Sequence, residues 1–210
     1  MKITKESRRL MLAMSIGDGY IDNSGGICIA HSIKQYNYLI WKLNKLKSLG
    51  IRVSEPAFRS NSGYGRYDIR INSSSYGKLL KRMLYTPTKK VTRKILSQLD
   101  AAGLAIWYMD DGSISNKRDS KGNVESSVLT ISTCVSREEN QVIIDYLAEV
   151  WGVKFGQRKM KNNFALICGT KEARKFIKIV EGTVREIDSM TYKLNVKVDP
   201  KTISKESTPK

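Results

Sequence analysis

Two segments of the chain share one pattern, an apolar helical run that is closed by an acidic residue and a glycine. The segments are residues 11–19 and 104–112, and their acids, Asp18 and Asp111, lie 93 positions apart. A carboxylate at the C-terminal end of a helix faces the negative end of the helix dipole and is disfavoured by about 0.3–1 kcal/mol. The glycine is a usual helix stop. Because the disfavoured acid occurs twice at equivalent places, we expect the pair to bind metal ions.

The predicted elements repeat around these two segments. In the first half we expect helices at 7–17, 33–49 and 73–84 and strands at 20–21, 27–31, 51–58 and 64–71. In the second half we expect a helix ending at Asp111, a flexible polar stretch at 115–126, strands at 128–135, 153–160 and 164–168, and helices at 136–151 and 170–180. A duplicated chain imitates a symmetric dimer. The sequence therefore predicts an α+β fold, a tandem pseudo-twofold repeat of αββαββα units, with repeats at 1–88 and 89–196 and a disordered tail at 197–210.

The charge of the chain indicates a polyanionic partner. Lys and Arg number 37 against 20 Asp and Glu, which gives a formal net charge of +17. Such an excess favours nucleic acid. A membrane surface is the weaker alternative, because the basic residues are scattered and do not lie on one amphipathic helix. No apolar run approaches the roughly 18 residues that span a bilayer, so we expect no membrane association.

The cysteine and histidine content argues against a zinc site. Cys28, Cys134 and Cys168 are far apart and odd in number, so we expect buried, reduced side chains. His31, the single histidine, is expected to be a strand residue rather than a ligand or a general base. We therefore expect an intracellular protein, in the cytoplasm of a bacterium or phage-infected host, or in the matrix of a mitochondrion or plastid.

The two acid-ended helices resemble those of the LAGLIDADG homing endonucleases. The likeness rests on residues 16–21 and 104–112 and extends in order and spacing over residues 7–195. It implies a monomer in which the two motif helices pack side by side at the interface, with two saddle-shaped antiparallel sheets in successive major grooves. The partner would be double-stranded DNA of roughly 18–22 bp, about two helical turns.

The resemblance also implies a catalytic site. The acidic motif position falls on Asp18 and Asp111, which would bind Mg²⁺ over the minor groove; Mn²⁺ would substitute, and Ca²⁺ would bind without cleavage. Gly17 and Asp110 complete the expected metal site, with Asp110 in a supporting or structural role. Relatives place a lysine near each active site at the positions of Lys90 and Lys193. These two would stabilise the scissile phosphate or activate water.

Metal ions held by carboxylates suit this chemistry. Phosphodiester hydrolysis needs an activated water, neutralisation of the phosphate charge and help for the leaving oxygen, and divalent metals supply all three without a histidine. Mg²⁺ prefers oxygen ligands and keeps several of its waters, so few protein ligands are needed.

The strands are expected to read the DNA. At residues 66–72 the period of two places Arg66, Asp68, Arg70 and Asn72 on one face. Arginine pairs with guanine and asparagine with adenine in the major groove, while loop lysines hold phosphates. The expected DNA contacts are Arg52, Arg59, Arg66, Arg70, Asn72, Lys117, Arg118, Lys121, Thr130, Ser132, Lys154, Arg158, Lys159 and Lys161. The alternative is a solvated sheet face, which is normal for an antiparallel sheet.

Three functions are compatible with these observations. The first is a sequence-specific endonuclease that makes a staggered double-strand break by metal-dependent hydrolysis. The second is a maturase that binds intron RNA on the same fold. The third is a DNA-binding protein that has lost catalysis. The presence of both Asp18 and Asp111 favours the endonuclease, because a binding protein does not need two metal-competent acids.

Overall fold

The computed structural model describes residues 3–61, 64–85, 88–161 and 163–197. The first half consists of α1 (Lys5–Ile16), β1 (Gly19–Ile21), β2 (Ile27–Ser32), η1 (Ile33–Gln35), α2 (Tyr36–Ser48), β3 (Ala57–Asn61), β4 (Tyr64–Ile71) and α3 (Ser75–Leu84). The second half consists of α4 (Arg93–Leu96), α5 (Ala101–Asp111), β5 (Gly112–Arg118), β6 (Val124–Val135), α6 (Arg137–Trp151), β7 (Gly156–Lys159), β8 (Phe164–Gly169), α7 (Thr170–Val184) and η2 (Asp188–Leu194).

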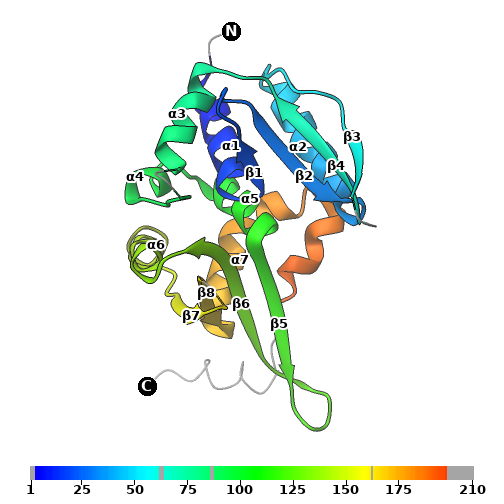
Figure 1. Ribbon diagram of the computed structural model, residues 1–210. Coiled ribbons are helices and arrows are strands. Elements are labelled where there is room, and N and C mark those ends of the chain that lie inside the picture. Colours follow the sequence, from blue (N-terminus) through cyan, green and yellow to red (C-terminus); the bar gives the residue numbers. More distant parts are fainter. Residues whose placement is uncertain (1–2, 62–63, 86–87, 162, 198–210) are drawn as a thin grey trace.

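Each half contributes one antiparallel sheet of four strands. The orders are β1-β2-β4-β3 and β5-β6-β8-β7, which are equivalent. The registers match as well, because Gly19 pairs with Ile29 in the first half and Gly112 pairs with Ile131 in the second. Figure 1 shows α1 and α5 in the middle of the molecule, between the two halves, and the two helices pack against each other. The predicted α+β fold with two related halves is confirmed.

One continuous apolar core joins the halves. Its centre is α5, in which every residue from Gly103 to Met109 is buried. A helix that is apolar on all sides needs neighbours on all sides, and α1, α7, β5 and β6 provide them. The expected boundary between residues 88 and 89 remains a prediction, and of the tail expected at 197–210, residues 198–210 lie outside the described residues. Within the described part of the chain, no helix is long and apolar enough to cross a membrane.

The prediction of a flexible stretch at 115–126 is wrong. β5 and β6 form a long hairpin there, which projects from the second half (Figure 1). The turn is closed by Asp119, whose backbone N–H donates to Asn123 O and whose carboxylate accepts from the amides of Lys121 and Asn123. Both faces near the tip of the hairpin reach solvent, so the strands carry polar residues and lack the apolar alternation that identifies a half-buried strand.

Other boundaries also differ from the predictions. The strands expected at 51–58 and 153–160 begin only at Ala57 and Gly156, and residue Val53 forms an isolated bridge to Ile71. The helix expected from residue 33 begins as the 3-10 turn η1, and α4 and η2 were not expected. Of the three cysteines, which are all free, only Cys168 is buried; Cys28 is half-buried and Cys134 is exposed.

Candidate metal centre and nucleic-acid face

The two motif acids lie at the ends of the central helices. α1 stops at Gly17, whose N–H donates to Ala13 O, and Asp18 leads directly into β1. α5 ends at Asp111, directly before β5. The two helix ends meet, because the backbone N–H of Asp18 donates to Oδ2 of Asp110 at 3.2 Å. The fold thus gathers Asp18, Asp110 and Asp111 at the contact between the halves.

The electrostatics of this cluster favour a cation. Burial raises the pKa of Asp18, and the neighbouring Asp110 carboxylate raises it further. The same two causes, together with the Asp18 charge, raise the pKa of Asp111 to about 7. Like charges that are held close together disfavour one another's ionised forms. A divalent cation among these oxygens would remove that repulsion.

Two lysines cap the ends of the motif helices. Nζ of Lys89 donates to the Gly17 carbonyl at 2.9 Å, and Nζ of Lys193 donates to the carbonyls of Met109 and Gly112, the latter at 2.9 Å. Basic groups stabilise the negative end of a helix. Burial lowers the pKa of both lysines, while the three aspartates act in the opposite direction. Each lysine is therefore held beside the acid cluster by backbone carbonyls.

The lysine expected before the second motif helix is Lys90, but the structure brings its neighbour into the site. The Lys90 side chain is exposed, and its backbone N–H donates to Leu84 O. Lys89 instead is half-buried and interacts electrostatically with Asp111 and Asp18. The Lys-Lys pair in the sequence gave no means of choosing between them. Lys193 lies where the sequence analysis placed it, beside the acids.

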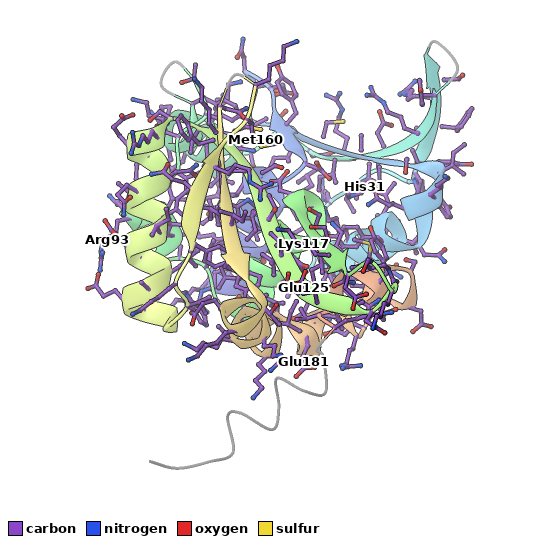
Figure 2. All side chains as sticks on the ribbon, turned by 90° about the horizontal axis from the view of Figure 1, so that it is seen from below. His31, Arg93, Lys117, Glu125, Met160 and Glu181 are labelled. Carbon is purple, nitrogen blue, oxygen red and sulfur yellow. The ribbon has the colours of Figure 1, made fainter. Side chains whose placement is uncertain are left out.

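A buried polar network beneath Asp18 was missed in the sequence. Oδ1 of Asp110 accepts from Lys42 Nζ at 2.7 Å and from the Tyr38 hydroxyl at 2.9 Å. Lys42 Nζ also lies 3.0 Å from Nε2 of His31, and Nδ1 of that ring lies 3.5 Å from Oδ2 of Asp18. His31 is on β2, as predicted, but on its buried face (Figure 2). Lys42 lies on the same face of α2 as buried leucines, and this position in the sequence could have indicated a buried lysine.

The pKa of His31 fixes its hydrogen-bonding role. Burial and the adjacent Lys42 ammonium lower the pKa of His31 to about 4. The ring is therefore neutral at pH 7. Because Lys42 has only donors, Nε2 of His31 accepts from Lys42, and Nδ1, which lies 3.5 Å from Oδ2 of Asp18, carries the proton.

Two sets of side chains could hold a metal ion. Asp18, His31 and Asp110 each offer a ligand atom, and these atoms lie within 4.8 Å of one another. However, Lys42 and Tyr38 already donate to Asp110, and Lys42 already donates to His31. The carboxylates of Asp18 and Asp111, which interact electrostatically, are oxygen donors that suit a hard cation such as Mg²⁺, and the nearby Gly17 carbonyl already accepts from Lys89.

The open face of the first sheet carries the expected arginines. Arg59 pairs in register with Arg66, and Arg70 pairs with Cys28, so all three side chains share one exposed face. Arg59 and Arg70 form long ion pairs with acids on the same surface, Arg59 with Asp68 at 3.4 Å. Exposed ion pairs of this kind contribute little to the stability of the fold. These arginines are therefore free to exchange their acid partners for a polyanion.

The second sheet presents a smaller part of the expected set. Lys117, Thr130 and Arg158 share its open face, and Lys117 lies on the hairpin of β5 and β6, which projects from the second half (Figure 1). Lys159 alternates to the opposite face, since it pairs with Phe164. The remaining candidates are exposed but lie outside this pattern: Arg52, Asn72, Lys154 and Lys161 flank strands, Ser132 follows the irregularity in β6, and Arg118 and Lys121 lie at the hairpin tip.

Comparison with known sequences identifies related proteins. A model of the LAGLIDADG DNA endonuclease family matches residues 10–176. Probable intron-encoded DNA endonuclease 3 from Mycosarcoma maydis is 32% identical over 119 residues, which cover 53% of this chain and 80% of that protein. Protein RecA from Mycobacterium gastri is 27% identical over 209 residues, which cover 91% of this chain. The chain spans about half of that protein, 48% of its length.

Solved structures share the fold. The homing endonuclease I-WcaI bound to its DNA recognition sequence has a TM-score of 0.76 at 20% identity, over 94% of this chain and 89% of that chain. The N-terminal LAGLIDADG domain of WhiA has a TM-score of 0.54 at 16% identity, over 86% of each chain. I-DmoI in complex with its target DNA and in the presence of Mn has a TM-score of 0.51 at 12% identity, over 86% of this chain and 96% of that chain.

Proposed function

Because the chain belongs to the LAGLIDADG DNA endonuclease family, we propose that it is a site-specific endonuclease that hydrolyses both strands of a DNA duplex with a divalent metal ion. It would act as a monomer, with one motif end cutting each strand and leaving staggered ends. The expected metal is Mg²⁺, with Mn²⁺ as a substitute, and the expected target spans roughly 18–22 bp, about two helical turns.

This proposal rests on the contact between the C-terminal ends of the two motif helices. Asp18 and Asp111 flank one contact between pseudo-symmetric halves, and a lysine is fixed at each helix end. The two strands of a duplex are themselves related by local twofold axes. A pseudo-twofold protein site therefore offers one acid to each strand, as a double-strand cut requires.

Each group has a role that follows from its place. Asp18 and Asp111 would hold the metal, and the Gly17 carbonyl is a further oxygen beside them. When bound, the metal supplies a low-pKa water and neutralises charge on the phosphate. Lys89 and Lys193 hold their ammonium groups on the backbone carbonyls beside the acid cluster, where a scissile phosphate would meet positive charge. The pKa of each is lowered by burial, which also makes these lysines more able to exchange a proton.

The exposed sheet faces supply the binding surface. Arg59, Arg66 and Arg70 on the first sheet and Lys117 and Arg158 on the second are suited to phosphates and guanine edges. The DNA complexes of I-WcaI and I-DmoI, which share this fold, support a duplex partner. The formal charge of +17 supports the same partner.

The maturase and the inactive binding protein remain the two alternatives. Neither explains why a fold should bring Asp18 and Asp111 together at a cost in electrostatic repulsion. Intron RNA binding would be independent of both acids, so the same variants distinguish the three functions.

A selection from a library of DNA duplexes tests the proposal. The protein is incubated with the library in Mg²⁺ or Mn²⁺, with Ca²⁺ as the non-cleaving condition. We expect discrete double-strand cuts with Mg²⁺ and Mn²⁺, which Asp18→Asn and Asp111→Asn each reduce to a nick in a different strand. Asp145→Asn, an exposed acid on α6, serves as the control and should cut normally. Cleavage that neither motif variant changes would contradict the assignment, and metal-independent binding of a structured intron RNA alone would favour the maturase.

A further inference from the structure

We infer that Asp110, although it belongs to the second motif, is a positioning residue for the first motif's acid, Asp18. Its carboxylate would hold the backbone of Asp18 directly and the side chain of Asp18 through Lys42 and His31. This inference rests on the proposed endonuclease function and assigns a role that the motif position alone does not give.

The direct link crosses between the halves. Oδ2 of Asp110 accepts the backbone N–H of Asp18 at 3.2 Å, at the point where α1 ends. Gly17 leaves room for this contact, because a Cβ at that position would overlap the Asp110 carboxylate. The Asp110 side chain is completely buried. The carboxylate therefore lies inside the contact between the halves.

The indirect link runs through two further side chains. Lys42, also completely buried, donates to Oδ1 of Asp110 at 2.7 Å and contacts Nε2 of His31 at 3.0 Å. This fixes the tautomer of His31 with the proton on Nδ1, which lies 3.5 Å from Oδ2 of Asp18. Because Lys42 holds one ring nitrogen of His31, the ring has a fixed orientation. Residues behind the ligands of a metal site orient those ligands in the same way.

The contacts of Asp110, Lys42 and His31 support Asp18 and, among the described residues, have no equivalent at Asp111. Asp110 and Gly17 are equivalent, since each precedes a motif acid. Thr133 and Ile144 take the places of His31 and Lys42, counted from the strand residues that pair with the motif glycines. In the second half, Thr133 Oγ1 bonds to Asn140 at 2.6 Å, which is an uncharged contact. Asp111 therefore depends on different partners, and loss of the Asp110 carboxylate should affect the two strand cuts unequally.

Strand-resolved cleavage by Asp110→Asn tests the inference. The amide can still accept from Lys42, but it has no second acceptor for the Asp18 N–H. We expect the strand that Asp18→Asn leaves uncut to be cut about tenfold more slowly, the other strand to change less than about threefold, and nicked duplex to accumulate. DNA affinity measured in Ca²⁺ should stay within about threefold of the wild type.

The matched control is Asp100→Asn. Asp100 is at the other end of α5 and also reaches across to α1, with its Oδ2 at 3.4 Å from Arg9 Nη1. We expect this variant to cut both strands in the wild-type ratio. His31→Gln provides a second variant that retains the Lys42–Asp110 pair, and it should show the same strand bias to a smaller degree.

The outcomes separate the two proposals. A wild-type protein that cuts no duplex overturns the proposed function, and this inference with it. A wild-type protein that cuts both strands, with Asp110→Asn and His31→Gln slowing both strands equally or neither, overturns this inference alone. If Asp110→Asn does not fold, His31→Gln decides. Amide hydrogen exchange at Asp18 should be faster in Asp110→Asn, and unchanged exchange also counts against the role.

Discussion

Nζ of Lys42 lies 2.7 Å from Oδ1 of Asp110, and neither side chain reaches solvent. Lys42 is on α2 of the first half and Asp110 is on α5 of the second, so this ion pair joins the two repeats. The hydroxyl of Tyr38 donates to the same oxygen, and its ring lies 4.4 Å from the Lys42 ammonium. A buried pair with several additional contacts is held firmly, but its loss leaves a buried charge.

Breaking this pair should destabilise the protein strongly. Lys42→Met leaves the Asp110 carboxylate buried without its cation, and we expect a loss of about 3–5 kcal/mol in the free energy of unfolding. The double variant Lys42→Met/Asp110→Leu removes both charges and should recover most of that loss. Urea unfolding of the single and double variants measures the coupling. A Lys42→Met variant of wild-type stability would contradict the burial of the pair.

The pH dependence of stability should report the repulsion among the acids. Folding raises the pKa of Asp111 from 3.8 to about 7, so the folded state binds this proton more tightly than the unfolded state. The contribution of Asp111 to stability is therefore fully present below pH 4 and is lost as the pH rises to about 7. Asp18, whose pKa is also raised, acts in the same direction.

Asp111→Asn isolates this effect. Without metal, we expect the variant to be more stable than the wild type at pH 8 and to lose that advantage at pH 5, because the neutral amide does not suffer the repulsion. Urea unfolding in EDTA at the two pH values gives the comparison. Equal changes in stability at both pH values would show that Asp111 is not electrostatically strained.

Cation binding should become stronger as the pH rises from 6 to 8. Metal ligands must be deprotonated, and a ligand that binds only the folded state raises its stability. We expect 10-fold excess Ca²⁺ over its Kd to raise Tm, corresponding to about 1.4 kcal/mol, with a larger shift at pH 8 than at pH 6 at the same Ca²⁺ concentration. Asp18→Asn and Asp111→Asn should each reduce the shift, while Asp145→Asn should not. A shift that is independent of pH and of both acids would place the cation elsewhere.

Much of this arrangement was predictable from local patterns. The repeated motif and the shared order of elements predicted most helices and strands of both halves, because hydrophobic period and helix stops are local properties, whereas the pairing of the two motif helices was implied by the resemblance to the family. The β5 strand was not predictable from its composition, since its polar residues are ordered by the pairing of Lys117 with Ser126 and neighbouring pairs. The strand starts at Ala57 and Gly156 were also missed, because the preceding residues alternate apolar and polar side chains as a strand does but form no ladder.

The site was predictable only in part. Asp18 and Asp111 are identified by the repeated motif. The choice of Lys89 over Lys90 depends on the path of the chain after α3, which the sequence alone does not determine. The role of Asp110 depends on His31 and Lys42, which come from a different half of the molecule. A lysine is rarely buried unless it is paired, so a lysine on the apolar face of an amphipathic helix indicates a buried polar partner.

The two adjacent lysines should differ in their effect on cleavage. Lys89→Met removes the ammonium that contacts the Gly17 carbonyl, whereas Lys90→Met changes an exposed side chain. We expect Lys89→Met to reduce the single-turnover cleavage rate at least about tenfold, and Lys90→Met to change it less than about threefold at matched DNA saturation. The reverse ranking would restore Lys90 as the catalytic candidate and contradict the geometry described above.

The fit between Gly17 and Asp110 can be tested with a single methyl group. The backbone of Gly17 has a φ of −77°, outside the left-handed region, and the space that a side chain would need there is occupied by Asp110. Because the new Cβ would overlap the Asp110 carboxylate, Gly17→Ala should reduce the free energy of unfolding by about 1–3 kcal/mol. Gly182→Ala in α7 is the matched control, since nothing lies within 4 Å of its new Cβ, and it should stabilise the protein by about 0.5–1 kcal/mol. Urea unfolding distinguishes the two, and stabilisation of both variants would mean that Asp110 does not press against the end of α1.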